Sequence, residues 1–258
     1  MNLHWNMDWV HGAGFTGIGW LVLAAIGSWL LLGEPLLGKR SYRALLDALD
    51  AGRADARARF YRSWTVQGWL LMFAVLALVF GILRWTPAHI GLRWPQVDFH
   101  AGSGFVAGML GAAVAGLLLG VVMARRQAAT GKAPTAPAVT GDVLRMLPRT
   151  PRERRGFALL SLTAGITEEV IWRGFLLTAL AVVFPHAPAW LLLLPMALVF
   201  GWAHLYQGWS GVLVTAILGA ILGGVYIGTG SLLLPIVLHA LVDLRALLIP
   251  VPHEDIDG

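Results

Sequence analysis

The fold is decided by residues 188–249, which read PAWLLLLPMALVFGWAHLYQGWSGVLVTAILGAILGGVYIGTGSLLLPIVLHALVDLRALLI. Three apolar segments, at about 188–206, 209–228 and 230–249, follow one another here with turns of only a few residues between them. A helix that crosses a bilayer needs about 20 mostly apolar residues, which is the length of each segment. Because short connections make antiparallel neighbours, this stretch predicts three transmembrane helices that pack together.

The same pattern extends toward the N-terminus. Four further apolar segments lie at about 14–33, 66–84, 102–123 and 157–183. The last of them is joined to the stretch above by the short turn 185–188, so we expect residues 157–249 to form a four-helix core. We predict an all-α, polytopic membrane protein of about seven transmembrane helices. Its parts would be an N-terminal three-helix region with basic cytoplasmic loops at 1–156, the core, and a cytoplasmic tail at 250–258.

Composition supports a membrane protein and excludes several function classes. Of the 258 residues, 57% are apolar and only 13% are charged, whereas ordinary soluble domains carry about 25% charged residues. The chain has no cysteine, which excludes a thiol nucleophile, a disulfide scaffold and a thiolate metal site. The net charge of +5 comes without a basic low-complexity tail, so the expected partner is the lipid bilayer rather than a nucleic acid.

Basic residues in the loops predict the orientation. Residues 34–65 hold seven Lys or Arg and residues 124–156 hold eight, whereas 85–101 holds only Arg93. Cytoplasmic loops are enriched in such residues, so we expect a multi-pass protein of the cell membrane with its N-terminus outside and its C-terminus in the cytoplasm. Residues 1–14 contain no Lys or Arg, which favours a retained anchor over a signal peptide. Residues 40–65 are predicted as a helix along the anionic leaflet or as a solvated connector.

Ionisable residues inside the apolar segments contain most of the functional information. An ionised group in lipid costs about 2.5–3.5 kcal/mol or more, so each one needs a reason. The predicted core places six of them in three segments: Glu168, Glu169 and Arg173 in the first, His204 in the second, and His239 and Asp243 in the fourth. Glu169 and Arg173 have the i,i+4 spacing of a helical ion pair. Glu168 points about 100° away from that pair and is free to act as a general base.

The remaining spacings predict that these groups meet. His239 and Asp243 face the same side of their helix, and Phe200, four residues before His204, can pack beneath the imidazole. The three helices could bring both imidazoles and the carboxylates to one site in the inner half of the bilayer. Such a site could hold Zn²⁺ with an open position for water. Alternatively, Glu168 and His204 could activate water without metal while His239 and a partner stabilise the oxyanion. Both chemistries hydrolyse an amide within a membrane.

Three short motifs carry a resemblance to a known family. Residues 168–174 match EExxxR(G), residues 200–204 match FxxxH, and residues 239–243 match HxxxN/D. In this order, with one motif per apolar helix, residues 157–249 resemble the CPBP family of intramembrane proteases. That family includes CAAX prenyl endopeptidases and bacteriocin-processing or Abi proteins. The resemblance implies an endopeptidase that opens toward the cytoplasm and cleaves a membrane-associated peptide or protein.

The resemblance also implies a role for each motif residue. Glu168 would activate the water with help from His204, and His239 with the last motif position would stabilise the oxyanion or bind metal. Glu169, Arg173 and Phe200 would support the site structurally.

The last motif position departs from the CAAX endopeptidases, which carry asparagine where this chain has Asp243. An ionised aspartate cannot donate to an oxyanion, so Asp243 would be protonated, ligate a metal or orient His239. The family is named for metalloproteases, although a metal-free glutamate mechanism has been argued for it. Candidate zinc ligands are Glu168, His204, His239 and Asp243, yet we favour a site without tightly bound zinc because the chain has neither a cysteine nor an HExxH helix.

Other functions fit parts of the sequence. A rhomboid-like serine protease could use Ser210, in the GxSG sequence 208–211, together with His239, but it would leave Glu168, Glu169 and Arg173 without a role. A non-catalytic membrane scaffold or immunity protein could use the same polar cluster for packing. A transporter could use intramembrane acids as a proton relay, but the sequence lacks the paired interrupted helices of inverted repeats.

Overall fold

A computed structural model describes residues 7–96 and 141–249, together with residues 107–108, 111, 114–116, 118–120, 122 and 126. This part of the chain contains helices and no strand, which confirms the predicted all-α class. The predicted span at 102–123 and the tail at 250–258 lie wholly or mostly outside the described residues.

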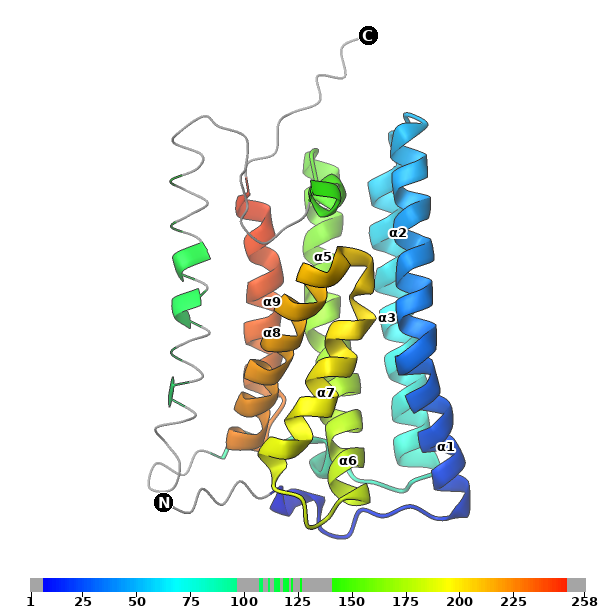
Figure 1. Cartoon of the computed structure of the whole chain (residues 1–258), viewed down its shortest axis with the longest axis vertical. Coiled ribbons are helices and arrows are strands. Elements are labelled where there is room, and N and C mark those ends of the chain that lie inside the picture. The colour runs from blue at the N-terminus through cyan, green and yellow to red at the C-terminus, as the bar shows by residue number, and fades with distance from the viewer. Residues whose placement is uncertain are drawn as a thin grey trace.

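The first two long helices form a hairpin. Helix α1 (Gly17–Ser28), the π-helical η2 (Trp29–Gly33) and α2 (Glu34–Asp50) join into one continuous helix of 34 residues, and α3 (Ala56–Gly81) runs back beside it (Figure 1). Residues 40–65 therefore form neither a helix along the leaflet nor a solvated connector. Their apolar side chains, including Tyr42, Leu45, Phe60 and Tyr61, are buried in a small cluster against the start of α5.

The next long helix contains three parts, α5 (Pro151–Glu168), the π-helical η5 (Glu169–Leu177) and α6 (Thr178–Val183). Its start is fixed by a capping box, because Thr150 Oγ1 accepts from the Glu153 amide while the Glu153 carboxylate accepts from the Thr150 amide. Three more helices follow: α7 (Ala189–Ala203), α8 (Gly208–Thr229) and α9 (Leu233–Leu244). Short helical turns complete the description: η1 (Asp8–Val10), η3 (Pro87–Ile90), η4 (Gly141–Met146), η6 (Leu205–Gln207) and η7 (Arg245–Leu248).

Length and composition identify three helices in the described chain that could cross a membrane, Gly17–Asp50, Ala56–Gly81 and Leu205–Thr229. The apolar helix Ala189–Ala203 is shorter. These helices support a multi-pass membrane protein. The count of seven spans, the four-helix core and the division at residue 156 remain predictions.

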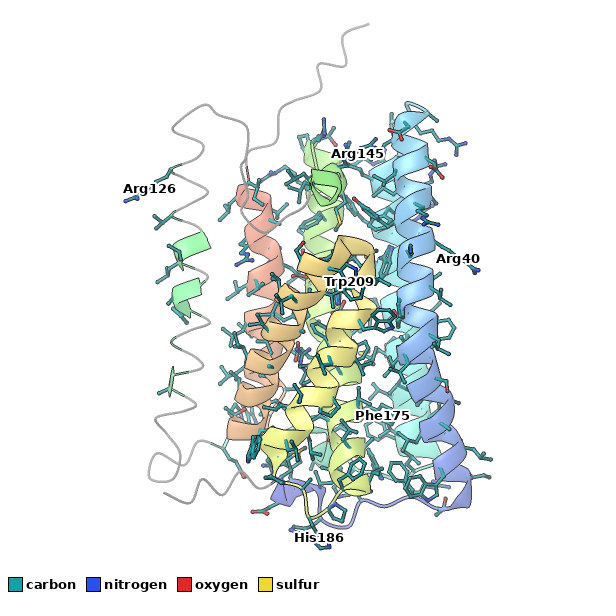
Figure 2. The ribbon with its side chains drawn as sticks, in the orientation of Figure 1. Arg40, Arg126, Arg145, Phe175, His186 and Trp209 are labelled. Atoms are coloured by element: carbon teal, nitrogen blue, oxygen red, sulfur yellow. The ribbon has the colours of Figure 1, made fainter. Side chains whose placement is uncertain are left out.

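The helices stand side by side, with α3 and α9 packed against α5, and α7 packed against α8 (Figure 1). We call "basic end" the end of the bundle that holds the α2–α3 turn and the start of α5. Helices α2, α3 and α5 rise farther toward this end than the turn between α7 and α8 does. Arg40, Arg126 and Arg145 lie in the half of the molecule nearer the basic end, and His186 lies at the opposite end (Figure 2).

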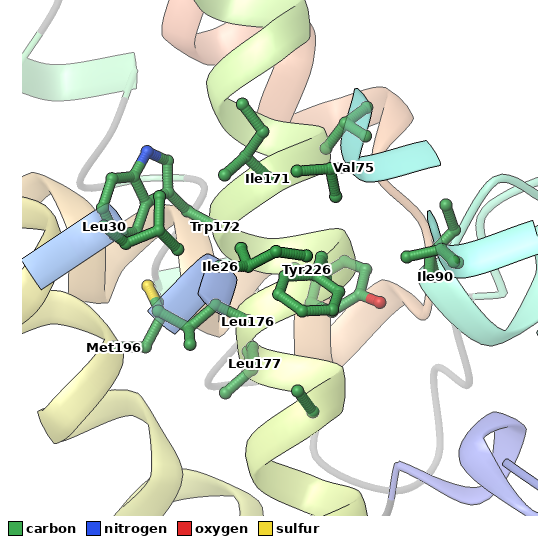
Figure 3. Packing of buried hydrophobic residues seen from close by; sticks show 14 of the residues in the cluster. Ile26, Leu30, Val75, Ile90, Ile171, Trp172, Leu176, Leu177, Met196 and Tyr226 are labelled. Atoms are coloured by element: carbon green, nitrogen blue, oxygen red, sulfur yellow. The ribbon is translucent and has the colours of Figure 1, made fainter. Parts of the chain in front are cut away.

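Fully buried apolar residues of α1, α3, η5, α7 and α8 pack into one core (Figure 3). Ile90, Leu177, Met196 and Tyr226 have no exposed surface. The turn after η3 fits closely against this core, because Gly91 has a φ of +73° and a Cβ there would lie 2.3 Å from the Tyr226 ring.

Polar contacts join the segment after η3 to the turn between α8 and α9. Arg93 Nε donates to the Gly230 carbonyl at 2.8 Å, and Ser231 Oγ donates to the Arg93 carbonyl. The Arg93 guanidinium also lies 5.0 Å from the centroid of the Trp9 ring.

Candidate active site

Glu168 lies where α5 passes into the π-helical η5, and two imidazoles face its carboxylate. Its Oε2 is 3.9 Å from His204 Nε2 and 3.9 Å from His239 Nε2. About a quarter of its side chain (26%) is exposed, and Oε2 itself is buried without a hydrogen-bond partner among the described residues. The carboxylate oxygen and the two imidazole nitrogens therefore converge, and Oε2 is left without a hydrogen-bond partner among the described residues.

A glycine allows this meeting of helices. Gly165 of α5 is so close to α9 that a Cβ there would lie 2.9 Å from both the amide nitrogen and the Cβ of Ala240. Glu168 is one turn after Gly165, and His239 is adjacent to Ala240. The small residue thus lets α5 and α9 approach at the level where their functional side chains meet.

Glu169 connects the predicted ion pair to the imidazole of α9. Its Oε1 accepts from Arg173 Nη1 at 2.8 Å and lies 2.7 Å from His239 Nδ1. The side chains of Glu169 and Arg173 have no exposed surface. Because a carboxylate accepts, His239 donates from Nδ1, and its Nε2 is directed toward Glu168. Asp243 Oδ2 lies 3.8 Å from the same Nε2, with about a third of its side chain (35%) exposed.

His204 is oriented by the helix that precedes it. Its Nδ1 is 2.9 Å from the Phe200 carbonyl, so that nitrogen donates and Nε2 faces Glu168. The Phe200 ring packs beneath the imidazole with 4.8 Å between ring centroids, as the spacing predicts. The Arg173 guanidinium lies 4.5 Å from the centroid of the same Phe200 ring. Phe200 therefore links the buried ion pair to His204.

The structure thus brings together all seven residues that the sequence singled out, Glu168, Glu169, Arg173, Phe200, His204, His239 and Asp243. Ser210 is different. Its Oγ is buried and forms no hydrogen bond with any described residue, so the Ser210–His239 pair of a rhomboid-like protease is not formed.

The donor atoms as placed do not fit a tetrahedral zinc centre. Two ligands of a tetrahedral zinc, each about 2.1 Å from the metal, lie about 3.4 Å apart. The Glu168–His204, Glu168–His239 and His239–Asp243 pairs are each 3.8–3.9 Å apart. Within the described ranges, no group of three His, Asp or Glu side chains has the arrangement of a metal site.

A cavity of about 350 Å³ contains this cluster, and Glu168, His204, His239 and Asp243 line it. Most of its wall is apolar or aromatic. The cavity has further polar residues that the sequence analysis did not predict, among them Glu34, Gln67, Tyr206 and Gln207. Glu34 had a detectable signal, since it is an acidic residue directly after the apolar segment predicted at 14–33.

Comparison with known proteins gives one match. Residues 154–245 match the family model described as type II CAAX prenyl endopeptidase Rce1-like. No curated protein and no solved structure matches the chain. The matched range contains all three motifs, and the resemblance to CPBP intramembrane proteases is confirmed.

Proposed function

We propose, from the match of residues 154–245 to the CAAX prenyl endopeptidase model, that this chain is an intramembrane endopeptidase of a membrane-associated peptide or protein. The observation that carries the proposal is the position of Glu168, whose unpartnered oxygen faces two imidazoles inside a cavity. The cavity would open to the cytoplasm in a protein of the cell membrane with its N-terminus outside.

Glu168 is the general base in this proposal. A water held between Glu168 Oε2 and His204 Nε2 gives a proton to the carboxylate as its oxygen attacks the carbonyl carbon of the scissile peptide bond. His204 Nε2, which is an acceptor when Nδ1 donates to Phe200, orients the water. Glu168 then returns the proton to the amide nitrogen as the carbon–nitrogen bond breaks.

His239 stabilises the oxyanion. In its doubly protonated form it donates from Nε2, and the three carboxylates within 4 Å compensate the added charge. Glu169 is a positioning residue, because its bond to Nδ1 fixes the orientation of the ring. Asp243 orients His239 from the other side, which is the role left to an aspartate that cannot itself donate to the oxyanion.

Replacement of Glu168 tests the proposal. Loss of a general base costs about 10²–10⁴-fold in rate, so Glu168→Gln should abolish detectable cleavage while leaving the folded yield unchanged. The measurement is peptide mapping of new chain ends in membranes of cells that contain the wild type, Glu168→Gln or no protein. Chain ends that appear equally with all three would overturn the protease and favour a non-catalytic scaffold.

The mechanism works without tightly bound zinc. Elemental analysis of purified, active protein should therefore find less than one zinc per chain, and chelation should leave activity unchanged. Stoichiometric zinc that is lost together with activity on chelation, and restored with it, would show that His204, His239, Asp243 or Glu168 are ligands.

A further inference from the structure

A third carboxylate, that of Glu34, lines the cavity beside those of Glu168 and Asp243 and has no role in the mechanism above. Glu34 Oε1 accepts from the indole Nε1 of Trp29 at 2.7 Å, but no cation of the described chain pairs with Glu34. An acidic residue without a counter-ion is costly at membrane depth, so its presence needs a reason.

The local backbone is built to hold these two side chains together. Trp29 and Glu34 are five residues apart, and the π-helical η2 between them places residues at that spacing on one face. Gly33 is required as well, because a Cβ at this position would lie 2.6 Å from the Trp29 ring. A π-helical segment is rare and costs regular hydrogen bonding, and such segments are frequent at functional sites.

Glu34 also lies where the cavity meets a groove between α2 and α3. Trp29, Ser63, Val66 and Leu70 line this groove, which shares Glu34, Gln67 and Leu71 with the catalytic cavity. Trp29 is 43% exposed, so its ring is accessible. A carboxylate beside an aromatic face is a combination that binds an ammonium or a guanidinium.

The two arginines of the groove lie toward its other end. Arg59 is paired with Asp55 at 3.1 Å. Arg62 precedes Gln67 by five residues of α3, which is about 8 Å along the helix axis. The region around Trp29 and Glu34 is therefore the acidic part of the groove.

We infer that Trp29 and Glu34 form a subsite for a lysine or arginine side chain of the substrate polypeptide. The inference rests on the proposed protease function. The basic side chain approaches along the groove between α2 and α3, pairs with Glu34 and lies against the Trp29 ring. Its fixed position sets which peptide bond reaches Glu168.

The first experiment compares cleavage sites. Chain ends would be mapped in membranes of cells that contain the wild type, Glu168→Gln, Glu34→Gln or Asp47→Asn. Cuts that depend on Glu168 should have Lys or Arg at one fixed distance from the cut, and Glu34→Gln should reduce them about tenfold or more. Asp47→Asn removes an exposed carboxylate of the same helix α2 and should leave the cuts unchanged.

The second experiment measures coupling. A cleaved substrate would be prepared with its basic residue or with Gln in that place, and both forms would be digested by purified wild type and Glu34→Gln. We expect the change to Gln to slow the wild type about tenfold or more and to have little effect on the variant. Equal slowing of both enzymes would overturn the subsite, even if Glu34→Gln lowers overall activity.

The outcomes separate the two proposals. Glu168-dependent cuts without a preferred basic residue would overturn the subsite and leave the protease intact. Absence of any Glu168-dependent cut would overturn the protease and the subsite with it.

Discussion

At the scale of single residues, one oxygen atom links the buried ion pair to the candidate site. Glu169 Oε1 is bound by both Arg173 and His239, and none of it is exposed. The resemblance assigns Glu169 and Arg173 to structural support. Their geometry adds a second role, because the His239 ring, which faces Glu168, is oriented through the same pair.

The buried pair should therefore be critical for folding. Removal of one member of a buried ion pair typically costs about 3–5 kcal/mol, because the other charge is left uncompensated. We expect Glu169→Ala and Arg173→Ala to lower the yield of monodisperse, detergent-solubilised protein far more than Glu168→Gln does. Yields equal to that of the wild type for both alanine variants would show that the pair is not needed for the fold.

At the scale of helices, close approaches set the geometry of the site. Gly219 and Gly223 of α8 face α7, where a Cβ would lie 2.9 Å from Phe200 Cδ1 and 2.8 Å from Met196 Cε. Their four-residue spacing predicts such a contact. Gly165 is the one glycine of α5 whose added Cβ would meet α9, so no glycine repeat in the sequence indicates this contact.

Replacement of Gly165 tests how strongly stability and cleavage depend on the close distance between α5 and α9. Gly165→Ala must push α5 away from the Ala240 backbone, which separates Glu168 from His239. We expect a loss of about 1–3 kcal/mol in stability, seen as a lower Tm, and a fall in cleavage rate of about tenfold or more.

Gly27→Ala is the matched control for this prediction, because a Cβ at Gly27 of α1 meets nothing within 4 Å. Its Tm should be equal to or slightly above that of the wild type, since alanine favours a helix. A Tm and rate for Gly165→Ala equal to those of the control would contradict the close contact.

The helices themselves were largely predictable, and their irregularities were not. The lengths of the apolar segments predict the bounds of α7, α8 and α9 to within a few residues, and the start of α3 to within about ten. This works because burial in lipid requires long apolar runs. The extension of α1 through α2 was missed, since its basic residues resemble a loop while Tyr42 and Leu45 pack against other helices. The π-helical turn at 29–33 leaves no periodic pattern of apolar residues in the sequence. The hydrogen bond between Trp29 and Glu34 could therefore not be predicted. By contrast, i,i+4 spacing and the rarity of charge in apolar segments were sufficient to select the residues that meet around Glu168.

At the scale of the whole molecule, the described basic residues predict how the bundle lies in the membrane. Arg40 and Arg145 lie toward the end where α2, α3 and α5 extend beyond the α7–α8 turn. A reporter fused after Arg126 should therefore read cytoplasmic, and one fused after Pro95 should read external. The reverse result for both fusions would invert the molecule and place the cavity on the outer side.

The fully buried apolar core has a consequence for a protein that spans a membrane. A water-filled cavity that reached both faces of an energised membrane would conduct protons and dissipate the potential. In this core, Ile90, Leu177, Met196 and Tyr226 have no exposed surface, and beside it Arg93 Nε donates to the Gly230 carbonyl. Leu177 is nine residues after Glu168, so this fully buried layer begins within about 14 Å of Glu168 along the helix axis. We therefore expect the proposed protease to admit water to Glu168 without conducting protons across the membrane.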